Sequence, residues 1–329
     1  MRSGMIWAYL IQLGENMWGD TTTVDQPPFH RVPFHPTLGV DDAVWRQVVD
    51  FLPAQGFNTV VIDIGDAILY ESHPEISIKG AWSKDKLKQE LDHMRAIGLT
   101  PIPKLNFSAG HDTWMGIYAR MVSTPQYYQV CEDLIKEVAE LFSYPELFHL
   151  GMDEETANMQ RGYEFCCVRQ QALWWHDLYF LFDCCQKVGA RPWVWADACW
   201  SCHGHQATYL EKMPKSVLQS NWFYAPMIRN EDGSFRDCQY EAYLTLEQAG
   251  FDQVPTVSTW QGRLENARVT MELAKNNFSP ERAKGFMTAP WQFTHRDKLY
   301  ALLNDAYCFG QGKRTIYPEE FEHTYTSFC

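Results

Sequence analysis

The chain has little positive charge: it contains 28 Lys and Arg against 41 Asp and Glu, which gives a formal net charge of −13. Nucleic acids and anionic membranes both bind to clusters of positively charged side chains, so neither is expected as a partner. The sequence also lacks an apolar run of the ~18 residues that a membrane-spanning helix needs. No small-residue cleavage site follows the short apolar run near the N-terminus, so we expect this run to be a strand and not an export signal.

Two further absences concern cofactors and disulfides. No Gly-rich phosphate loop follows the first apolar run, which removes the main mark of a dinucleotide-binding domain, and no cofactor is expected. The chain has ten cysteines, but the adjacent pairs Cys166-Cys167 and Cys184-Cys185 lie in predicted helices. In a chain of this length, such pairs suit buried thiols better than a disulfide framework. The expected location is therefore a reducing cytoplasm, and the sequence does not indicate an oligomeric state.

Apolar and aromatic residues are plentiful. They make up 46% and 15% of the chain, far above the low hydrophobicity that is typical of disorder, so a globular protein is expected. Aromatic residues beyond the needs of a core often line a pocket. A length of 329 residues fits one large domain or two modest ones.

Short runs rich in β-branched and aromatic residues alternate with longer amphipathic segments, which is the pattern of repeated βα units. The expected helices include residues 41–56, 84–98, 126–142, 170–189 and 296–310, each ending at or next to a possible stop signal such as glycine. The eight expected strands begin at Met5, Thr59, Thr100, Glu146, Arg191, Val217, Val254 and Gly285. This order predicts an α/β fold in which residues 1–329 form a single (β/α)8 TIM barrel domain.

Polar and aromatic side chains follow most of the expected strands. In a barrel the carboxyl ends of the strands converge on one pocket, so these side chains are candidate site residues. Trp rings suit the C–H faces of a sugar, and Asp, Asn and Gln suit its hydroxyls, so the set predicts a carbohydrate site. The acidic candidates are Asp153 and Glu154; the candidate substrate-binding residues are Glu15, Asn106, His111, Asp112, Trp195, Asp197, Trp200, Trp222, Trp260 and Trp291. The long segments 21–39 and 228–237 are expected to be loops, and both would lie at this end of the barrel.

Each candidate also has a purely structural interpretation. A Trp at a strand end is more often a packing residue than a ligand contact, and a lone Asp there often caps a helix. Asp153 could cap a following helix, with Glu155 as a favourable residue in its first turn. The structural interpretation weakens for the group, because Trp recurs after the fifth, sixth, seventh and eighth strands.

Two segments resemble the family 20 glycoside hydrolases, the β-N-acetylhexosaminidases. His149-Leu150-Gly151-Met152-Asp153-Glu154 is similar to the family's motif at the fourth strand, which reads His, an apolar residue, two Gly, Asp and Glu. IPKLNFSAGHDTW is similar to the family's third-strand segment, which ends in Pro-Gly-His, and this match aligns His111. WVWAD and NWFY, at the fifth and sixth strands, are weaker matches.

The resemblance implies roles for individual residues. Glu154 would be the general acid that protonates the leaving glycosidic oxygen and later the base that activates water. Asp153 would orient the substrate's own 2-acetamido group, which replaces an enzyme nucleophile. Tyr224 would hydrogen-bond the acetamido oxygen, His111 would support the acid pair, and Trp195, Trp200 and Trp291 would wall the sugar site.

The sequence also departs from this family. The arginine that the family has near the first strand has no counterpart in IWAYLIQLGENMWGD. Phe293 stands two residues after Trp291, where the family has Glu, and Lys104 and Asn106 stand where carboxylates are usual. The family's extra N-terminal domain does not fit into this chain. We therefore expect altered sugar recognition.

Three other hypotheses stay open. In a conventional retaining glycosidase, Glu154 would be the acid and Asp197 or Asp63 the nucleophile. A barrel that has lost catalysis would bind sugar without turnover. A metal hydrolase is suggested by CWSCHGH, in which Cys199, Cys202, His203 and His205 have short spacings compatible with zinc.

Overall fold

The computed structural model describes residues 4–22, 32–167 and 169–322. They contain a parallel sheet of eight strands in the order β6-β5-β4-β3-β2-β1-β8-β7. The strands are β1 (Ile6–Gln12), β2 (Thr59–Asp63), β3 (Thr100–Lys104), β4 (Leu147–His149), β5 (Arg191–Trp195), β6 (Leu218–Ser220), β7 (Thr256–Val257) and β8 (Gly285–Thr288). Each lies within one of the eight runs that the sequence predicts.

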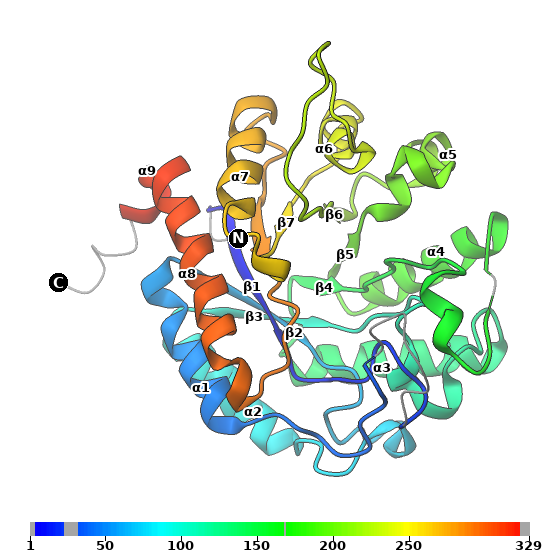
Figure 1. The fold of residues 1–329 in the computed structure, drawn as a ribbon. Coiled ribbons are helices and arrows are strands. Elements are labelled where there is room, and N and C mark those ends of the chain that lie inside the picture. Colours follow the sequence, from blue (N-terminus) through cyan, green and yellow to red (C-terminus); the bar gives the residue numbers. More distant parts are fainter. Residues whose placement is uncertain (1–3, 23–31, 168, 323–329) are drawn as a thin grey trace.

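The sheet curves into a barrel (Figure 1). β1 pairs with β2 on one side and with β8 on the other, so the first and last strands are neighbours. β6 and β7 stand at the two ends of the strand order, and isolated bridges such as Gln219↔Gln253 and Trp222↔Thr256 join their segments. The barrel is thus nearly closed, and the predicted (β/α)8 fold is confirmed.

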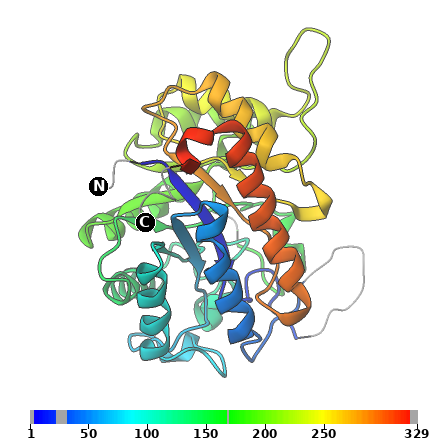
Figure 2. The same ribbon diagram turned by 90° about the vertical axis from the view of Figure 1, so that its left-hand side faces the viewer.

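Helices follow the strands and surround the barrel (Figure 1). α1 and α8 lie side by side outside it (Figure 2). The helices are α1 (Asp42–Phe51), α2 (Lys84–Ala96), α3 (Pro125–Leu141), α4 (Ala172–Lys187), α5 (Gln206–Lys212), α6 (Cys238–Gln248), α7 (Asn266–Asn277), α8 (Leu299–Ile316) and α9 (Pro318–Glu322). No helix of the described residues is long and apolar enough to cross a membrane.

Local sequence explains several helix ends. The side chain of Asp41 accepts hydrogen bonds from the first amides of α1, and Ser83 does the same for α2. Gly98 follows α2 with a φ of 88°, as the sequence predicts. α8, however, continues past Gly310, where its end was predicted. Gly310 packs against the segment that follows α1, and a Cβ added to Gly310 would lie 2.8 Å from the Gln55 carbonyl oxygen. The lack of a side chain at this position therefore allows α8 to pack closely against that segment.

The strands place apolar side chains on both faces of the barrel wall. Outward-facing residues such as Tyr9, Ile11 and Ile62 pack beneath the helices. Inward-facing residues such as Leu10 and Trp193 belong to a second cluster that fills the barrel. This interior also holds a buried ion pair between Lys104 Nζ and Asp63 Oδ2.

The two predicted long loops have different outcomes. Residues 23–31 of segment 21–39 lie outside the described residues, and the rest of the segment forms no helix or strand, as predicted, apart from an isolated bridge between Thr37 and Lys79. Segment 228–237 is a loop as predicted; it extends away from the barrel (Figure 2), and Arg229 bridges Phe235 across it in antiparallel fashion.

The cysteine prediction is half right. Cys184 and Cys185 are buried in α4, as expected. Cys166 and Cys167 lie in no helix, and Cys166 is exposed, so the prediction of a buried helical pair is wrong there. They lie before α4, which begins at Ala172, close to its predicted start at residue 170.

Candidate active site

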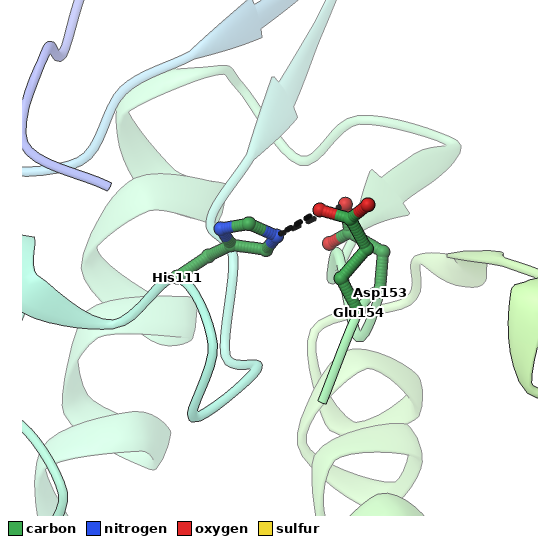
Figure 3. Close-up of side chains that lie close together, drawn as sticks. All are labelled: His111, Asp153 and Glu154. Carbon is green, nitrogen blue, oxygen red and sulfur yellow. Dashed lines mark ion pairs between the residues drawn. The ribbon is translucent and has the colours of Figure 1, made fainter. Parts of the chain in front are cut away.

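The loop after β4 brings the two acidic candidates to one side of the chain. β4 ends at His149, and Gly151 and Met152 then adopt left-handed conformations with φ values of 70° and 74°. In a regular strand, neighbouring side chains would point to opposite faces. Because the strand has ended and the backbone turns, the carboxylates of Asp153 and Glu154 lie together (Figure 3).

Both carboxylates face the same imidazole nitrogen. His111 Nε2 lies 3.5 Å from Asp153 Oδ2 and 3.3 Å from Glu154 Oε2. His111 and Asp153 are buried, whereas about a third of the Glu154 side chain is exposed. The sequence prediction placed these three residues in one site from two separate segments, and the structure brings them into contact.

His111 carries a positive charge at neutral pH. Burial alone would lower its pKa, but the Asp153 charge and the Glu154 hydrogen bond outweigh burial and raise the pKa of His111 to about 9. An imidazolium at this position attracts both carboxylates and fixes where they lie.

Asp153 is held by groups from the segment after β3. Asn106 Nδ2 donates to Asp153 Oδ1 over 2.8 Å, and the Ser108 hydroxyl donates to the Asp153 carbonyl over 2.6 Å. Asn106 Oδ1 in turn accepts from the amides of Ser108 and Met152, each at 3.1 Å. One amide side chain therefore fixes both the loop after β3 and the carboxylate after β4.

Asp197, after β5, holds the other acidic residue by its backbone. Its Oδ2 accepts from the Glu154 amide over 2.9 Å, and the side chain is buried. Burial, followed by the charge of Asp153, raises the pKa of Asp197 well above its ordinary value.

Four of the predicted Trp residues form a continuous aromatic wall together with Tyr224. The Trp195 and Trp291 ring centroids are 6.0 Å apart, and Trp291 Nε1 donates to the Tyr224 hydroxyl over 2.9 Å. Tyr224 then contacts Trp222, which contacts Trp200, at centroid distances of 5.4 and 4.8 Å. Trp291 has a φ of 51°, which is unusual for a bulky residue and shows that its surroundings impose its position.

Tyr224 remains a phenol. Burial is the largest cause that raises its pKa well above the ordinary value, and the charges of Asp153 and Glu154 raise it further. Because its oxygen already accepts from Trp291, its own proton is available for donation to a ligand oxygen.

Three other predicted site residues lie apart from the acid pair. The buried Glu15 carboxylate is 2.8 Å from His295 Nε2 and 3.6 Å from His35 Nδ1. Asp112 is buried and accepts from the Arg120 amide, and this burial is the main cause that raises its pKa to about 6. Trp260 is 44% exposed. Their predicted role in substrate binding stays a prediction.

Glu155 is not the first-turn helix residue that the sequence predicts. No helix begins directly after Asp153, because the next helical turn starts only at Met159, so Asp153 caps no helix and Glu155 is in no first turn. Glu155 instead accepts two hydrogen bonds from the fully buried Arg169, at 2.8 and 2.7 Å. Arg169 also donates to Asp177 on α4 and to the Phe107 carbonyl after β3. Sequence reasoning missed Arg169, because nothing local marks a cation whose partners are all distant in the chain.

The alternative zinc site in CWSCHGH is not supported, because its His and Cys side chains form no group with metal-like spacing. In the part of the chain that the structure describes, the one group of three His, Cys, Asp or Glu side chains with metal-like spacing is His111, Asp153 and Glu154, whose candidate ligand atoms lie within 4.8 Å of one another. One imidazole and two carboxylates could hold a divalent cation. The ion pairs of His111 Nε2 with both carboxylates also account for this group.

A cavity of about 290 Å³ adjoins the site behind the loop after β4. Asp197 and Met152 contribute to its lining, as do His203, Gln170 and Trp174. Amides, imidazoles and an indole suit an uncharged polar ligand. This cavity was not predicted, because its walls come from the loops after both β4 and β5.

No protein-family model and no curated protein matches the chain. Solved structures do. A family 20 β-N-acetylhexosaminidase from Streptomyces coelicolor has a TM-score of 0.60 at 12% identity, with 98% of this chain and 70% of that chain covered. A family 20 exo-β-N-acetylglucosaminidase from Vibrio harveyi has a TM-score of 0.59 at 14% identity, with 98% and 58% covered.

The chain has the barrel fold of the family 20 glycoside hydrolases. A chitobiase from Flavobacterium johnsoniae gives a similar result, with a TM-score of 0.57 at 14% identity and 87% of this chain covered. The chain spans about half of that chitobiase (48%) and 58% of the Vibrio protein. The family 20 fold is therefore shared over nearly the whole chain despite the low identity.

Proposed function

We propose that the chain is a retaining glycoside hydrolase that removes a terminal β-linked N-acetylhexosamine with assistance from the substrate's own acetamido group. The observation that carries this proposal is the contact of Asp153 and Glu154 with one nitrogen of His111. The aromatic wall of Trp195, Trp291, Tyr224, Trp222 and Trp200 supports a sugar as the ligand.

Each step needs one group that the site supplies. Glu154 gives its proton to the glycosidic oxygen as the bond to the anomeric carbon breaks, and the acetamido oxygen attacks that carbon to form an oxazolinium ion. Asp153 accepts from the acetamido N–H, while the Tyr224 hydroxyl donates to the acetamido oxygen. Glu154 then takes a proton from the water that attacks the anomeric carbon, which restores the acid and retains the configuration.

The partial exposure of Glu154 fits this role. About a third of its side chain is accessible, whereas Asp153 is nearly covered. An acid must reach both the leaving group and the incoming water, while a carboxylate that only orients the substrate benefits from fixed hydrogen bonds, such as the one from Asn106.

A conventional retaining mechanism needs an ionised enzyme carboxylate as the nucleophile. Burial raises the pKa of Asp197 well above its ordinary value, which disfavours the ionised form, and its Oδ2 already accepts from the Glu154 amide. Asp63 is buried in the barrel against Lys104. These two observations favour the acetamido-assisted mechanism over the conventional one.

A barrel that binds sugar without hydrolysis is the second candidate. Phe293 stands at the position where family 20 glycoside hydrolases have Glu. Its ring packs against Trp18, His35 and His295 at centroid distances of 5.3 to 6.2 Å. A hydrophobic contact there removes one group that would hold sugar hydroxyls.

The substitution Glu154→Gln tests the proposal. It keeps the size of the side chain but removes the transferable proton, so hydrolysis of an aryl β-N-acetylhexosaminide should fall by roughly 10²- to 10⁴-fold. The melting temperature should remain within about 2 °C of the wild type, since the side chain is partly exposed. Glu140→Gln, at the exposed end of α3, is the matched control and should retain full activity.

The outcomes separate the candidates. Equal turnover by the wild type and the Glu154→Gln variant would contradict the proposal. Calorimetric binding of N-acetylglucosamine by a wild type that hydrolyses none of a panel of aryl glycosides would select the non-catalytic barrel. Full activity toward glycosides without an acetamido group would select the conventional mechanism.

A further inference from the structure

Two cysteines that are 36 residues apart in sequence have their sulfur atoms in contact. Cys202 Sγ and Cys238 Sγ are 2.6 Å apart. This separation is shorter than the contact of two non-bonded sulfurs and close to the ~2.05 Å of a disulfide bond. Among the described cysteines no other pair has such a sulfur contact.

Both sulfurs lie at the protein surface. Cys202 is exposed in the 3₁₀-helix η6 (Ser201–His203), and Cys238, the first residue of α6, is half-buried. A small-molecule disulfide can therefore reach them, unlike the buried Cys131, Cys185 and Cys199.

We propose that Cys202 and Cys238 are an oxidisable dithiol, and that their disulfide ties the loop after β5 to the start of α6. A low-molecular-weight disulfide, RSSR, is the oxidant. One cysteine thiolate attacks RSSR and releases one RS⁻, and the second cysteine then displaces the second RS⁻ to form the Cys202–Cys238 bond. Both thiol protons end on the released thiols, so two cysteines are oxidised and RSSR is reduced to two RSH.

The bond would reinforce connections that already join the two segments. Trp200, two residues before Cys202, donates through Nε1 to Asn221 Oδ1 over 2.7 Å. Asn221 Nδ2 donates to the carbonyl of Gln239, the residue after Cys238, over 2.8 Å. A covalent link would thus complete a chain of contacts around the ring of Trp200 in the aromatic wall.

The segments that would be linked are otherwise weakly held. No side chain caps α6, and none of the η6 residues is buried. The loop 228–237 enters α6 directly and is mostly exposed. Since few buried contacts restrain these residues, a covalent bond should restrict their motion more than it would restrict a packed helix.

The pair would respond to its surroundings. In the reducing compartment that the sequence predicts, it would remain a dithiol, and in an oxidising compartment it would close. Burial and the neighbouring Cys238 raise the pKa of the Cys202 thiol to about 11, which slows its reaction at neutral pH. This inference does not depend on the proposed hydrolase function.

The experiment compares the full chain after incubation with reduced and with oxidised glutathione. Peptide mapping of the oxidised protein should show residues 202 and 238 cross-linked with a loss of two hydrogens, and the melting temperature should rise by about 5 °C. Amide exchange should slow in residues 200–205 and 238–242. Cys202→Ser and Cys238→Ser should each abolish all three changes, whereas Cys166→Ser, at another exposed cysteine, should leave them intact.

Each alternative outcome contradicts a defined part of the inference. Glutathione attached singly to Cys202, without a cross-link, would show that the two sulfurs do not pair. A rise in melting temperature that persists in Cys202→Ser would assign the effect to other cysteines. A cross-link that forms without any change in amide exchange would overturn its proposed effect on the loop that carries Trp200.

Discussion

Asn106 is the residue that orients Asp153. It donates to the carboxylate and accepts from two backbone amides, so it restrains both loops of the acid pair. Asn106→Ala leaves a buried, charged oxygen without its donor, which should destabilise the protein by about 1.5 to 3 kcal/mol. Hydrolysis by the proposed mechanism should fall at least about tenfold at every pH.

Asn106→Asp gives a different expectation. Two carboxylates at hydrogen-bond distance hold one proton between them at low pH and repel each other when it is lost. The variant should therefore remain active at acidic pH. As the pH rises, its activity should fall at a lower pH than the activity of the wild type does, which a pH–rate profile measures. Asn277→Ala, in α7 and bonded to its own helix, is the control. The same profile for all three variants would contradict the role of Asn106.

His111 makes stability depend on pH in a defined window. Its pKa is about 9 in the folded protein and about 6.5 when unfolded, so the folded state holds an extra proton between these values. Its stabilisation is complete below pH 6.5 and is lost as the pH rises through 9. Urea unfolding should show the wild type losing on the order of 3 kcal/mol across this range.

His111→Gln removes the titrating group and should flatten that part of the pH profile. His93→Gln, in the exposed pair of α2 with Asp50, is the matched control and should retain the wild-type slope. An unchanged slope in His111→Gln would show that other groups bind the proton.

Arg169 anchors the loop after β4. Its guanidinium is completely buried and binds Glu155 of the loop, Asp177 of α4 and the Phe107 carbonyl. Arg169→Ala leaves two buried carboxylates without their cation, which should cost about 3 to 5 kcal/mol of unfolding free energy. Because this loop also positions Asp153 and Glu154, activity should fall with stability.

Arg169→Lys should rescue little of this loss. A single ammonium cannot reproduce the two parallel hydrogen bonds to Glu155. Arg268→Ala on α7, where exposed ion pairs join residues of one helix, is the control and should cost less than about 1 kcal/mol. Chemical unfolding measures all three variants, and a small effect of Arg169→Ala would show that the loop is held by other contacts.

Closure of the whole barrel depends on Gly285 at the β1–β8 pairing. Its φ is 148°, and an added Cβ would lie 1.9 Å from the Ile6 carbonyl oxygen, against a strand that cannot move aside. We expect Gly285→Ala to prevent β8 from pairing with β1, so the variant should be insoluble or should lack a cooperative melting transition.

Gly98→Ala separates backbone strain from this clash. Gly98 also has a positive φ, 88°, but nothing lies within 4 Å of its added Cβ, so the change should cost only about 1 kcal/mol. A soluble Gly285→Ala protein with a normal melting transition would show that the strands can separate without loss of the barrel.

The eight strands and most helices were predictable because their signals are local. Strand runs such as 60–62 are apolar since both faces of a barrel strand are buried, and amphipathic helices repeat every 3.6 residues. The end of α8 was not predictable, because a glycine can either end a helix or allow close packing within one, and Gly310 does the latter. The start of α4 at Ala172 lies within two residues of its predicted start at residue 170.

The sequence by itself determined the barrel and pointed to Asp153 and Glu154 as candidates, because βα alternation and the His149–Glu154 motif are written in consecutive residues. Only the tertiary structure decided how those carboxylates are held: by the imidazole of His111, the side-chain amide of Asn106, the Asp197 carboxyl group that accepts from the Glu154 amide, and the cation of Arg169 that anchors their loop. It also decided that Cys202 meets Cys238. These contacts join residues that are far apart in the chain, and their energies depend on burial, which exists only after the strands have closed around them.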